Sequence, residues 1–327
     1  FFYALKNDTF IFGSEIKTLL EYPDIEPVID RKGIIDLLFI GPGRTPGCGV
    51  FRDIHELEPG HCGTFDRNGL RTFSYWKLKD RLHTETFEET SDHVRYLVTD
   101  AIRRQLVSDV PLGTFLSGGL DSSIISAVAA SHFRSLGHQL DTFSVTYTDN
   151  QKYFKTSKFQ PTTDEPYIQM MAEFLGSNHH TFVVDNEQLA LALKAAVDAR
   201  DLPGMADVDS SLLLFCEEIK KHVTVALSGE CADEIFGGYP WYRDEKIRSA
   251  YGFPWAQTTA MRQKFLTTHL RKLIDGEAEV SARYEQALAE TDKSEGLSPK
   301  ESRLREMVHL NMYWFMQTLL TCNVYLG

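Results

Sequence analysis

The sequence predicts an α/β protein built on a doubly wound parallel sheet, and three observations support this prediction. From residue 111 onward, short runs rich in Val, Phe and Thr alternate with amphipathic helical segments. This alternation is typical of a parallel sheet whose two faces are covered by helices. The first 78 residues carry strand and turn signals, and the chain after about residue 245 has helical patterns. We therefore expect a β-rich segment, a parallel-sheet domain and a helical C-terminal part.

Length, charge and cysteine content restrict the class of protein. The 327 residues exceed one comfortable hydrophobic core, so we predict two domains, 1–78 and 79–327. A net charge of -12 argues against binding to nucleic acid. No apolar run approaches the roughly 18 residues of a membrane span, so we expect no membrane partner. The five cysteines are widely spaced and form no C-x-x-C pair, which favours a reducing compartment, the cytoplasm.

The N-terminal segment contains two hairpin signals with two short helices between them. FFYAL and TFIFG flank a polar Asn7-Asp8 turn, and Asn68-Gly69 is the strongest hairpin signal in the chain. Residues 14–22 and 30–40 have short helical patterns, and Asp30 is the expected N-cap of the second.

A long helix is predicted after the polar residues 79–92. Its apolar positions are spaced by three and four, so we expect this face to pack on a neighbour; they are Val94, Leu97, Val98, Ala101, Ile102 and Leu106. The runs PLGTFL, TFSVTY, HHTFVV and VTVAL that follow are expected strands, with helical segments between them. The apolar stretch at 312–320 is expected to be a buried helix.

The stretch FLSGGLDSSI at 115–124 joins the first expected parallel strand to a helix. Gly118 and Gly119 let backbone N–H groups approach an anion, and the helix N-terminus favours negative charge. Asp121 would repel phosphates unless a divalent cation such as Mg²⁺ lies between them. The alternative is that Asp121 and the serines only cap a helix. No lysine follows the glycines, so cleavage between the α and β phosphates is favoured over γ-phosphoryl transfer.

A second loop, ALSGECADEIFGGY at 226–239, follows another expected strand. If both strands are parallel in one sheet, the two loops open onto the same crevice. Asp121 and Asp233 could then bind one Mg²⁺, leaving Glu230 for proton transfer. The alternative is that Glu230, Asp233 and Glu234 only stabilise the first turn of a helix through its dipole.

The motif SGGLDSS resembles the pyrophosphate loop (PP-loop) of the ATP pyrophosphatases, which have an adenine-nucleotide α-hydrolase-like fold. The pair of loops is similar to that of glutamine-dependent asparagine synthetases, whose second loop usually reads SGEGxDExFGGY. This chain has Cys231 where the family usually has Gly, and because a small residue remains we expect little change. Residues 2–20 resemble the end of that family's N-terminal glutaminase domain, and residues 56–61 and 164–180 also have counterparts there.

The resemblance implies ATP-dependent amidation of aspartate to asparagine through β-aspartyl-AMP, with release of AMP and pyrophosphate and with ammonia normally supplied from glutamine. It also implies roles for individual residues. Leu116 and Val145, at the ends of their strands, would line adenine and ribose. Glu230 would act as the base or charge stabiliser when ammonia attacks. Asp121 and Asp233 would hold Mg²⁺. The remaining ATP- and pyrophosphate-binding residues would be Ser117, Gly118, Gly119, Ser122, Ser228 and Gly229.

Several alternatives stay open at this point. A related PP-loop enzyme could adenylate another carboxylate, as a β-lactam synthetase does, because the loops specify activation and not the acid. A nucleotide-binding module without catalysis is a further alternative, and a tRNA-modifying relative is disfavoured by the charge. We also expect the chain to be a fragment that lacks most of the glutaminase domain and the C-terminal end. A homodimer is left open.

Overall fold

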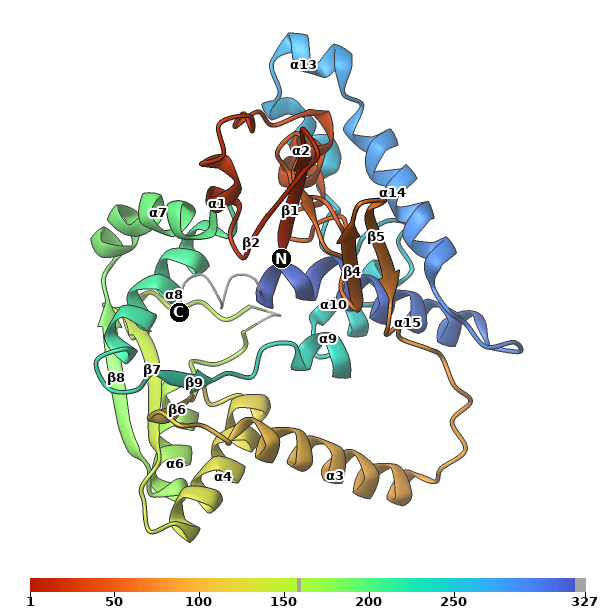
Figure 1. Cartoon of the computed structure of the whole chain (residues 1–327). Helices are drawn as coiled ribbons and strands as arrows, with labels where there is room; N and C mark the ends of the chain where they lie inside the picture. Colours follow the sequence, from red (N-terminus) through yellow and green to blue (C-terminus); the bar gives the residue numbers. More distant parts are fainter. Residues whose placement is uncertain (158–159, 321–327) are drawn as a thin grey trace. The chain divides into compact units, whose positions relative to one another are not determined.

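The computed structural model describes residues 1–157 and 160–320, and Figure 1 shows the course of the chain. The chain forms two compact units. Among the described residues, unit 1 comprises 1–81, 197–205 and 233–320, and unit 2 comprises 82–157, 160–196 and 206–232. We describe each unit by itself. The predicted domain boundary at residue 78 stays a prediction.

Unit 2 is built on a four-stranded sheet in which every neighbouring pair is parallel. The strand order is β8-β7-β6-β9, so the chain adds two strands on one side of β6 and then returns to its other side. This reversal produces a topological switch point between β6 and β9. The strands are β6 (Leu112–Phe115), β7 (Asp141–Tyr147), β8 (Asn178–Val184) and β9 (Val225–Leu227).

Helices cover both faces of this sheet, as the alternating pattern predicted. One apolar cluster joins Leu112 of β6 to Ala129 and Leu175 of two helices. A separate cluster joins Phe143 of β7 to Phe215 on the opposite face. The helices of this unit are α3 (Phe87–Gln105), α4 (Leu120–Ser135), α5 (Asn150–Tyr153), α6 (Glu165–Leu175), α7 (Asn186–Arg200, whose last turn belongs to unit 1) and α8 (Ala206–Ile219).

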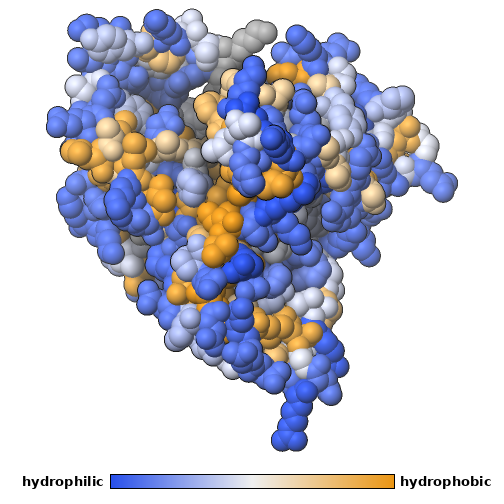
Figure 2. Space-filling view, turned by 90° about the horizontal axis from the view of Figure 1, so that it is seen from above, coloured by the Kyte–Doolittle hydropathy of each residue, from blue (hydrophilic) through white to orange (hydrophobic). Residues whose placement is uncertain are grey.

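The predicted packing face of α3 is only partly buried. Ile102 and Leu106 are 8% and 6% exposed, and Leu106 joins the cluster that contains α4. Val94 and Leu97, in contrast, are 38% and 52% exposed. The expectation that the whole apolar face packs on a neighbour is therefore wrong for its N-terminal half. That half is stabilised locally instead, by a capping box between Thr86 and Glu89. Figure 2 shows other apolar side chains exposed on a largely hydrophilic surface.

Unit 1 begins with the predicted hairpin of β1 (Phe2–Lys6) and β2 (Thr9–Gly13), and β3 (His55–Glu56) pairs with the other edge of β1. Asn7 and Asp8 form the turn, both with positive φ. A second hairpin joins β4 (His61–Asp66) to β5 (Gly69–Ser74). Its turn lies one residue earlier than the Asn68-Gly69 signal indicates, because Gly69 with φ 95° is already paired with Asp66.

The two short N-terminal helices are present, and the second packs against the C-terminal helices. Asp30 caps it as predicted, by accepting a hydrogen bond from the Gly33 N–H at 3.0 Å. Phe39, Phe253 and Trp314 belong to one buried cluster. These helices are α1 (Ile16–Leu20), α2 (Arg31–Ile35) and its π-helical continuation η1 (Asp36–Ile40).

The described chain after residue 232 consists of helices and the loops that connect them. In the stretch 312–320, Trp314, Phe315 and Gln317 are buried but Leu320 is 45% exposed, so the expected buried helix is confirmed only in part. No helix among the described residues is long and apolar enough to cross a membrane. The helices are α9 (Ala232–Phe236), α10 (Pro240–Arg243), α11 (Glu245–Arg248), α12 (Thr259–Arg262), η2 (Gln263–Phe265), α13 (Thr268–Leu273), α14 (Gly276–Glu290), α15 (Pro299–Leu310) and η3 (Asn311–Phe315).

Candidate active site

Two loops lie side by side at the carboxyl edge of the sheet in unit 2. β6 and β9 are parallel neighbours, with Thr114 opposite Leu227, so the segments that follow them leave the sheet together. A β-carbon built on Gly229 would come within 3.0 Å of the Asp121 Cβ and 3.3 Å of the Ser122 nitrogen. The first turn of α4 and the loop after β9 are therefore in direct contact. The sequence predicted a shared crevice on the condition that both strands are parallel in one sheet, and this condition is met.

The first loop is held by hydrogen bonds between its own serines. The Ser117 and Ser122 hydroxyls lie 3.0 Å apart, and the Ser117 N–H donates to the Ser122 Oγ at 3.2 Å. Ser122 also donates to the Gly119 carbonyl at 3.2 Å. Ser122 is buried, whereas Ser117 and Gly119 are exposed. Ser122 therefore shapes the loop, and Ser117 and the Gly119 backbone are accessible to a ligand.

Gly118 is required at its position for two reasons. Its φ of 78° lies in the left-handed region, which an L side chain rarely adopts. A β-carbon there would also meet the Tyr167 Cβ at 2.8 Å and the Ile168 nitrogen at 3.0 Å. The sequence argument gave this glycine an anion-binding role, and the structure adds that α6 packs directly against it.

The acids of the two loops differ in their surroundings. Asp121 is half-buried at the start of α4, and this burial raises the pKa of its carboxyl group. A bound cation would favour the ionised form and oppose that shift. Glu230 is exposed at the end of the second loop. Asp233 lies in the first turn of α9 and belongs to unit 1, so a metal site shared by Asp121 and Asp233 stays a prediction.

Other residues of the second loop also depart from simple expectation. Cys231 has φ 75°, a conformation that glycine adopts without steric cost and cysteine does not. The expectation that a cysteine in place of glycine changes little did not allow for this conformation. Glu234 is 1% exposed and accepts a hydrogen bond from the Tyr239 hydroxyl at 2.6 Å. Glu234 is thus part of the local packing.

The two residues predicted to line adenine and ribose are less accessible than the others. Leu116 directly follows β6, but the residue is only 1% exposed and its N–H donates to the Phe143 carbonyl at 2.8 Å, so a contact with the nucleotide stays a prediction. Val145 lies inside β7 and packs with the cluster around Phe143, two residues before the strand ends. The description of Val145 as the end of its strand is therefore wrong.

The histidine pair of β8 is packed among polar side chains. His179 contacts the hydroxyls of Thr142 and Ser144 at 2.9 and 3.1 Å, and burial lowers its pKa. His180 lies 2.9 Å from an Asp141 oxygen. Among the residues that the structure describes, no group of three or more His, Cys, Asp or Glu side chains is arranged to hold a metal. The predicted Mg²⁺ site needs fewer protein ligands than such a group, because two carboxylates would bind the ion and phosphate oxygens would complete its coordination.

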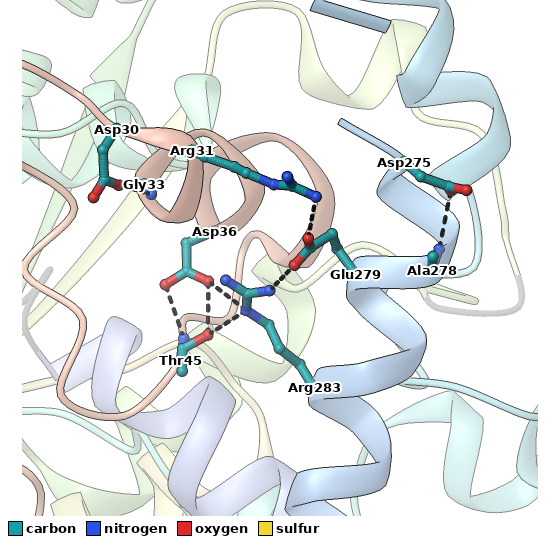
Figure 3. Close-up of polar contacts among 9 residues, drawn as sticks. All are labelled: Asp30, Arg31, Gly33, Asp36, Thr45, Asp275, Ala278, Glu279 and Arg283. Carbon is teal, nitrogen blue, oxygen red and sulfur yellow. Dashed lines mark hydrogen bonds and ion pairs between the residues drawn. The ribbon is translucent and has the colours of Figure 1, made fainter. Parts of the chain in front are cut away.

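A polar network in unit 1 was not predicted from the sequence. Figure 3 shows Asp36 of η1 bound to Thr45 and facing Arg283 of α14, which also binds Glu279. Glu279 in turn pairs with Arg31 of α2. The network ties α14 to α2 and η1. The residues of α14 lie more than 200 positions from their partners in the N-terminal segment, so no local pattern could reveal these contacts. A cavity of about 430 Å³ in the same unit is lined by Asp36 among others, but by none of the predicted site residues.

Comparison with known proteins assigns the chain. Residues 93–324 match the model of the asparagine synthase family, and residues 1–76 match that of a glutamine amidotransferase domain. The glutamine-hydrolysing asparagine synthetase 3 of Bacillus subtilis is 49% identical over 321 residues, which cover 98% of this chain and 52% of that protein.

Two further relatives are more distant. The glutamine-hydrolysing asparagine synthetase 1 of Bacillus subtilis is 34% identical over 246 residues, covering 74% of this chain and 36% of that protein. A Gibberella zeae protein named amidase chry2 is 26% identical over 279 residues, covering 80% of this chain and 40% of that protein. The chain thus spans about half or less of the length of these relatives. Because the first family model covers most of the chain and contains both loops, the chain belongs to the asparagine synthase family.

Proposed function

We propose that this chain activates the side-chain carboxylate of aspartate with ATP and transfers ammonia to it, forming asparagine, AMP and pyrophosphate. One observation carries the proposal: the serine- and glycine-rich loop after β6 touches the acid-containing loop after β9, at the switch point of a parallel sheet. Ligands of such sheets bind at this point. Membership of the asparagine synthase family and the names of the Bacillus subtilis relatives support the same reaction.

The residues of the two loops suit a reaction in two steps. In the first step a carboxylate oxygen of aspartate attacks the α-phosphorus, the bond to the β-phosphate breaks and pyrophosphate leaves. The N–H groups of Gly118 and Gly119, the Ser117 hydroxyl and the N-terminus of α4 would receive the negative charge that pyrophosphate carries away. Ser228 and Gly229 would lie near the α-phosphate, because Gly229 is in contact with the first turn of α4.

In the second step ammonia attacks the activated carbonyl and AMP leaves. The nitrogen must lose a proton, and an exposed carboxylate next to the Ser228-Gly229 pair is placed to accept it. We assign this role to Glu230. The carboxylate needs activation first because its own oxygens are poor leaving groups, whereas AMP is a good one.

The donor set fits Mg²⁺, a cation that prefers carboxylate and phosphate oxygens. Asp121 and Asp233 would hold it, and when bound it would neutralise the charge of the pyrophosphate.

The N-terminal segment matched by the glutamine amidotransferase model supports glutamine as the natural source of ammonia. A cytoplasmic location agrees with Cys48, Cys62 and Cys216, which form no disulfide among the described residues, and the oligomeric state stays open.

The test is exchange of labelled pyrophosphate into ATP. Exchange that requires aspartate, followed by asparagine formation when ammonium is supplied, is the expected result. Exchange without any dependence on aspartate would refute the assigned acid. Absence of ATP binding would refute the function as a whole.

A second candidate is activation of a different carboxylate by the same loops. The loops would contact phosphates and would not select the acid, and one of the relatives is named as an amidase. A panel of carboxylic acids in the exchange assay separates the two candidates. The first predicts that aspartate supports the fastest exchange, and the second that another acid does.

A further inference from the structure

Glu165 begins α6, and its carboxylate binds Thr146 near the end of β7 and Asn150 at the start of α5. Its Oε1 accepts hydrogen bonds from the Thr146 hydroxyl at 3.0 Å and from the Asn150 side-chain amide at 2.9 Å. The bond from Asn150 is the largest cause of a lowered pKa, so the carboxylate is ionised at neutral pH. The sequence argument assigned no role to this residue.

The same turn of α6 lies against the phosphate loop. A β-carbon on Gly118 would meet the Tyr167 Cβ at 2.8 Å and the Asp164 carbonyl oxygen at 3.2 Å. Movement of this turn would therefore displace the backbone of the loop. Through Glu165 the turn is also fixed to Thr146 and Asn150, so one carboxylate connects the segments that follow two neighbouring strands, β6 and β7.

The second oxygen of this carboxylate is not needed for that connection. Glu165 Oε2 is buried and makes no hydrogen bond to Thr146 or Asn150. A glutamine could accept both bonds through one oxygen, so the connection by itself does not demand an ionised side chain.

We propose that Glu165 is a positioning residue of the nucleotide site. It sets the distance between the phosphate loop and the segment after β7, so that the phosphates and the adenosine of ATP are held in one geometry. The inference rests on the proposed function and adds a residue to it. Its consequence is selective: loss of Glu165 weakens the interaction with ATP and leaves the interaction with the acid substrate unchanged.

The experiment compares Glu165→Ala and Glu165→Gln in the whole chain, with Glu173→Ala as the matched control. Glu173 lies on the same helix, is exposed, and its carboxylate accepts a hydrogen bond from the Gln169 side-chain amide at 3.2 Å. We expect Glu165→Ala to raise the KM for ATP about tenfold, the effect of losing one or two hydrogen bonds. Glu165→Gln keeps the acceptor oxygen and should stay within about threefold of the unchanged protein. The KM for aspartate should be the same in all variants.

Titration of each variant with Mg²⁺-ATP separates the possible failures. If the unchanged protein does not bind ATP, the proposed function is refuted, and this inference is refuted with it. If the unchanged protein binds ATP and Glu165→Ala binds it equally well, Glu165 is not a positioning residue. A parallel rise of both KM values, with lower thermal stability and no rescue by glutamine, would assign Glu165 to general folding and overturn the proposal.

Discussion

Gly229 and Asp121 are in contact although 107 sequence positions separate them: a β-carbon at Gly229 would lie 3.0 Å from the Asp121 Cβ. This contact is possible because β6 and β9 are parallel neighbours. It places a phosphate-binding motif and an acidic motif at one edge of the sheet. Glycine is therefore needed at position 229, because a side chain there would push the two loops apart.

Gly229→Ala should separate the loops by a few tenths of an ångström. We expect pyrophosphate exchange to fall about tenfold or more and the free energy of unfolding to fall by about 1–2 kcal/mol, as overpacking does elsewhere. Gly63→Ala in β4 is the control, because a β-carbon there makes only ordinary contacts of 3.5 Å or longer. Exchange at the unchanged rate in Gly229→Ala would show that the contact has no part in activity.

Asp121→Asn should abolish pyrophosphate exchange without unfolding the protein. The amide keeps the size of the carboxylate but cannot bind Mg²⁺ as strongly, and removal of such an electrostatic group costs on the order of 100-fold or more in rate. Thermal stability without ATP and Mg²⁺ should not decrease, because burial already disfavours the ionised form. Asp92→Asn on the exposed surface of α3 is the control. Normal exchange in Asp121→Asn at ordinary Mg²⁺ would refute the metal assignment.

Glu230→Gln should affect the chemical step and spare ATP binding. Glutamine cannot accept the proton of ammonia, and loss of a general base lowers rates by about 100-fold or more. Asparagine formation should fall by that factor while the affinity for Mg²⁺-ATP stays within about threefold. The opposite pattern, lost ATP affinity with normal turnover of bound ATP, would make Glu230 a binding residue.

Cys231→Gly should stabilise the protein. A left-handed conformation costs an L-residue roughly 1–2 kcal/mol, and the greater freedom of glycine in the unfolded chain offsets part of the gain. We expect the free energy of unfolding, measured with urea, to increase by about 0.5–1 kcal/mol. Cys231→Ala removes the thiol but keeps the β-carbon, so it should not stabilise. Equal effects of the two substitutions would mean that φ at this position, 75°, is not the cause.

His179 should make stability depend on pH. Burial lowers its pKa in the folded state, so the neutral form is favoured there, and its contribution to stability is present above the unfolded pKa near 6.5. That contribution is lost as the pH falls toward and through the lowered folded pKa. Urea unfolding at about pH 7.5 and about pH 5.5 should show a loss of stability that is smaller in His179→Gln. His138→Gln, at an exposed position, should leave the loss unchanged; the same loss in both variants would contradict the assignment.

Local signals in the sequence were enough for most elements and for the choice of family. The alternation of strands and helices after residue 111 predicted the covered parallel sheet, and Asp30 predicted a helix start that the structure confirms. The motif SGGLDSS and the second loop indicated the family that the comparisons show. These signals are readable because turn, cap and periodicity preferences act over a few residues.

The tertiary structure alone decided which distant segments meet. That β9 pairs with β6, that Gly118 packs on α6, and that Glu165 joins α6 to the segment after β7 all depend on packing between residues far apart in sequence. The same holds for the half-exposed face of α3, because periodicity predicts an apolar stripe but not whether a partner covers it. The backbone conformation of Cys231 was likewise invisible, since the surrounding fold and not the residue imposes a positive φ. Sequence patterns thus fix the local preferences of this chain, and long-range packing selects the single arrangement in which they can all be satisfied.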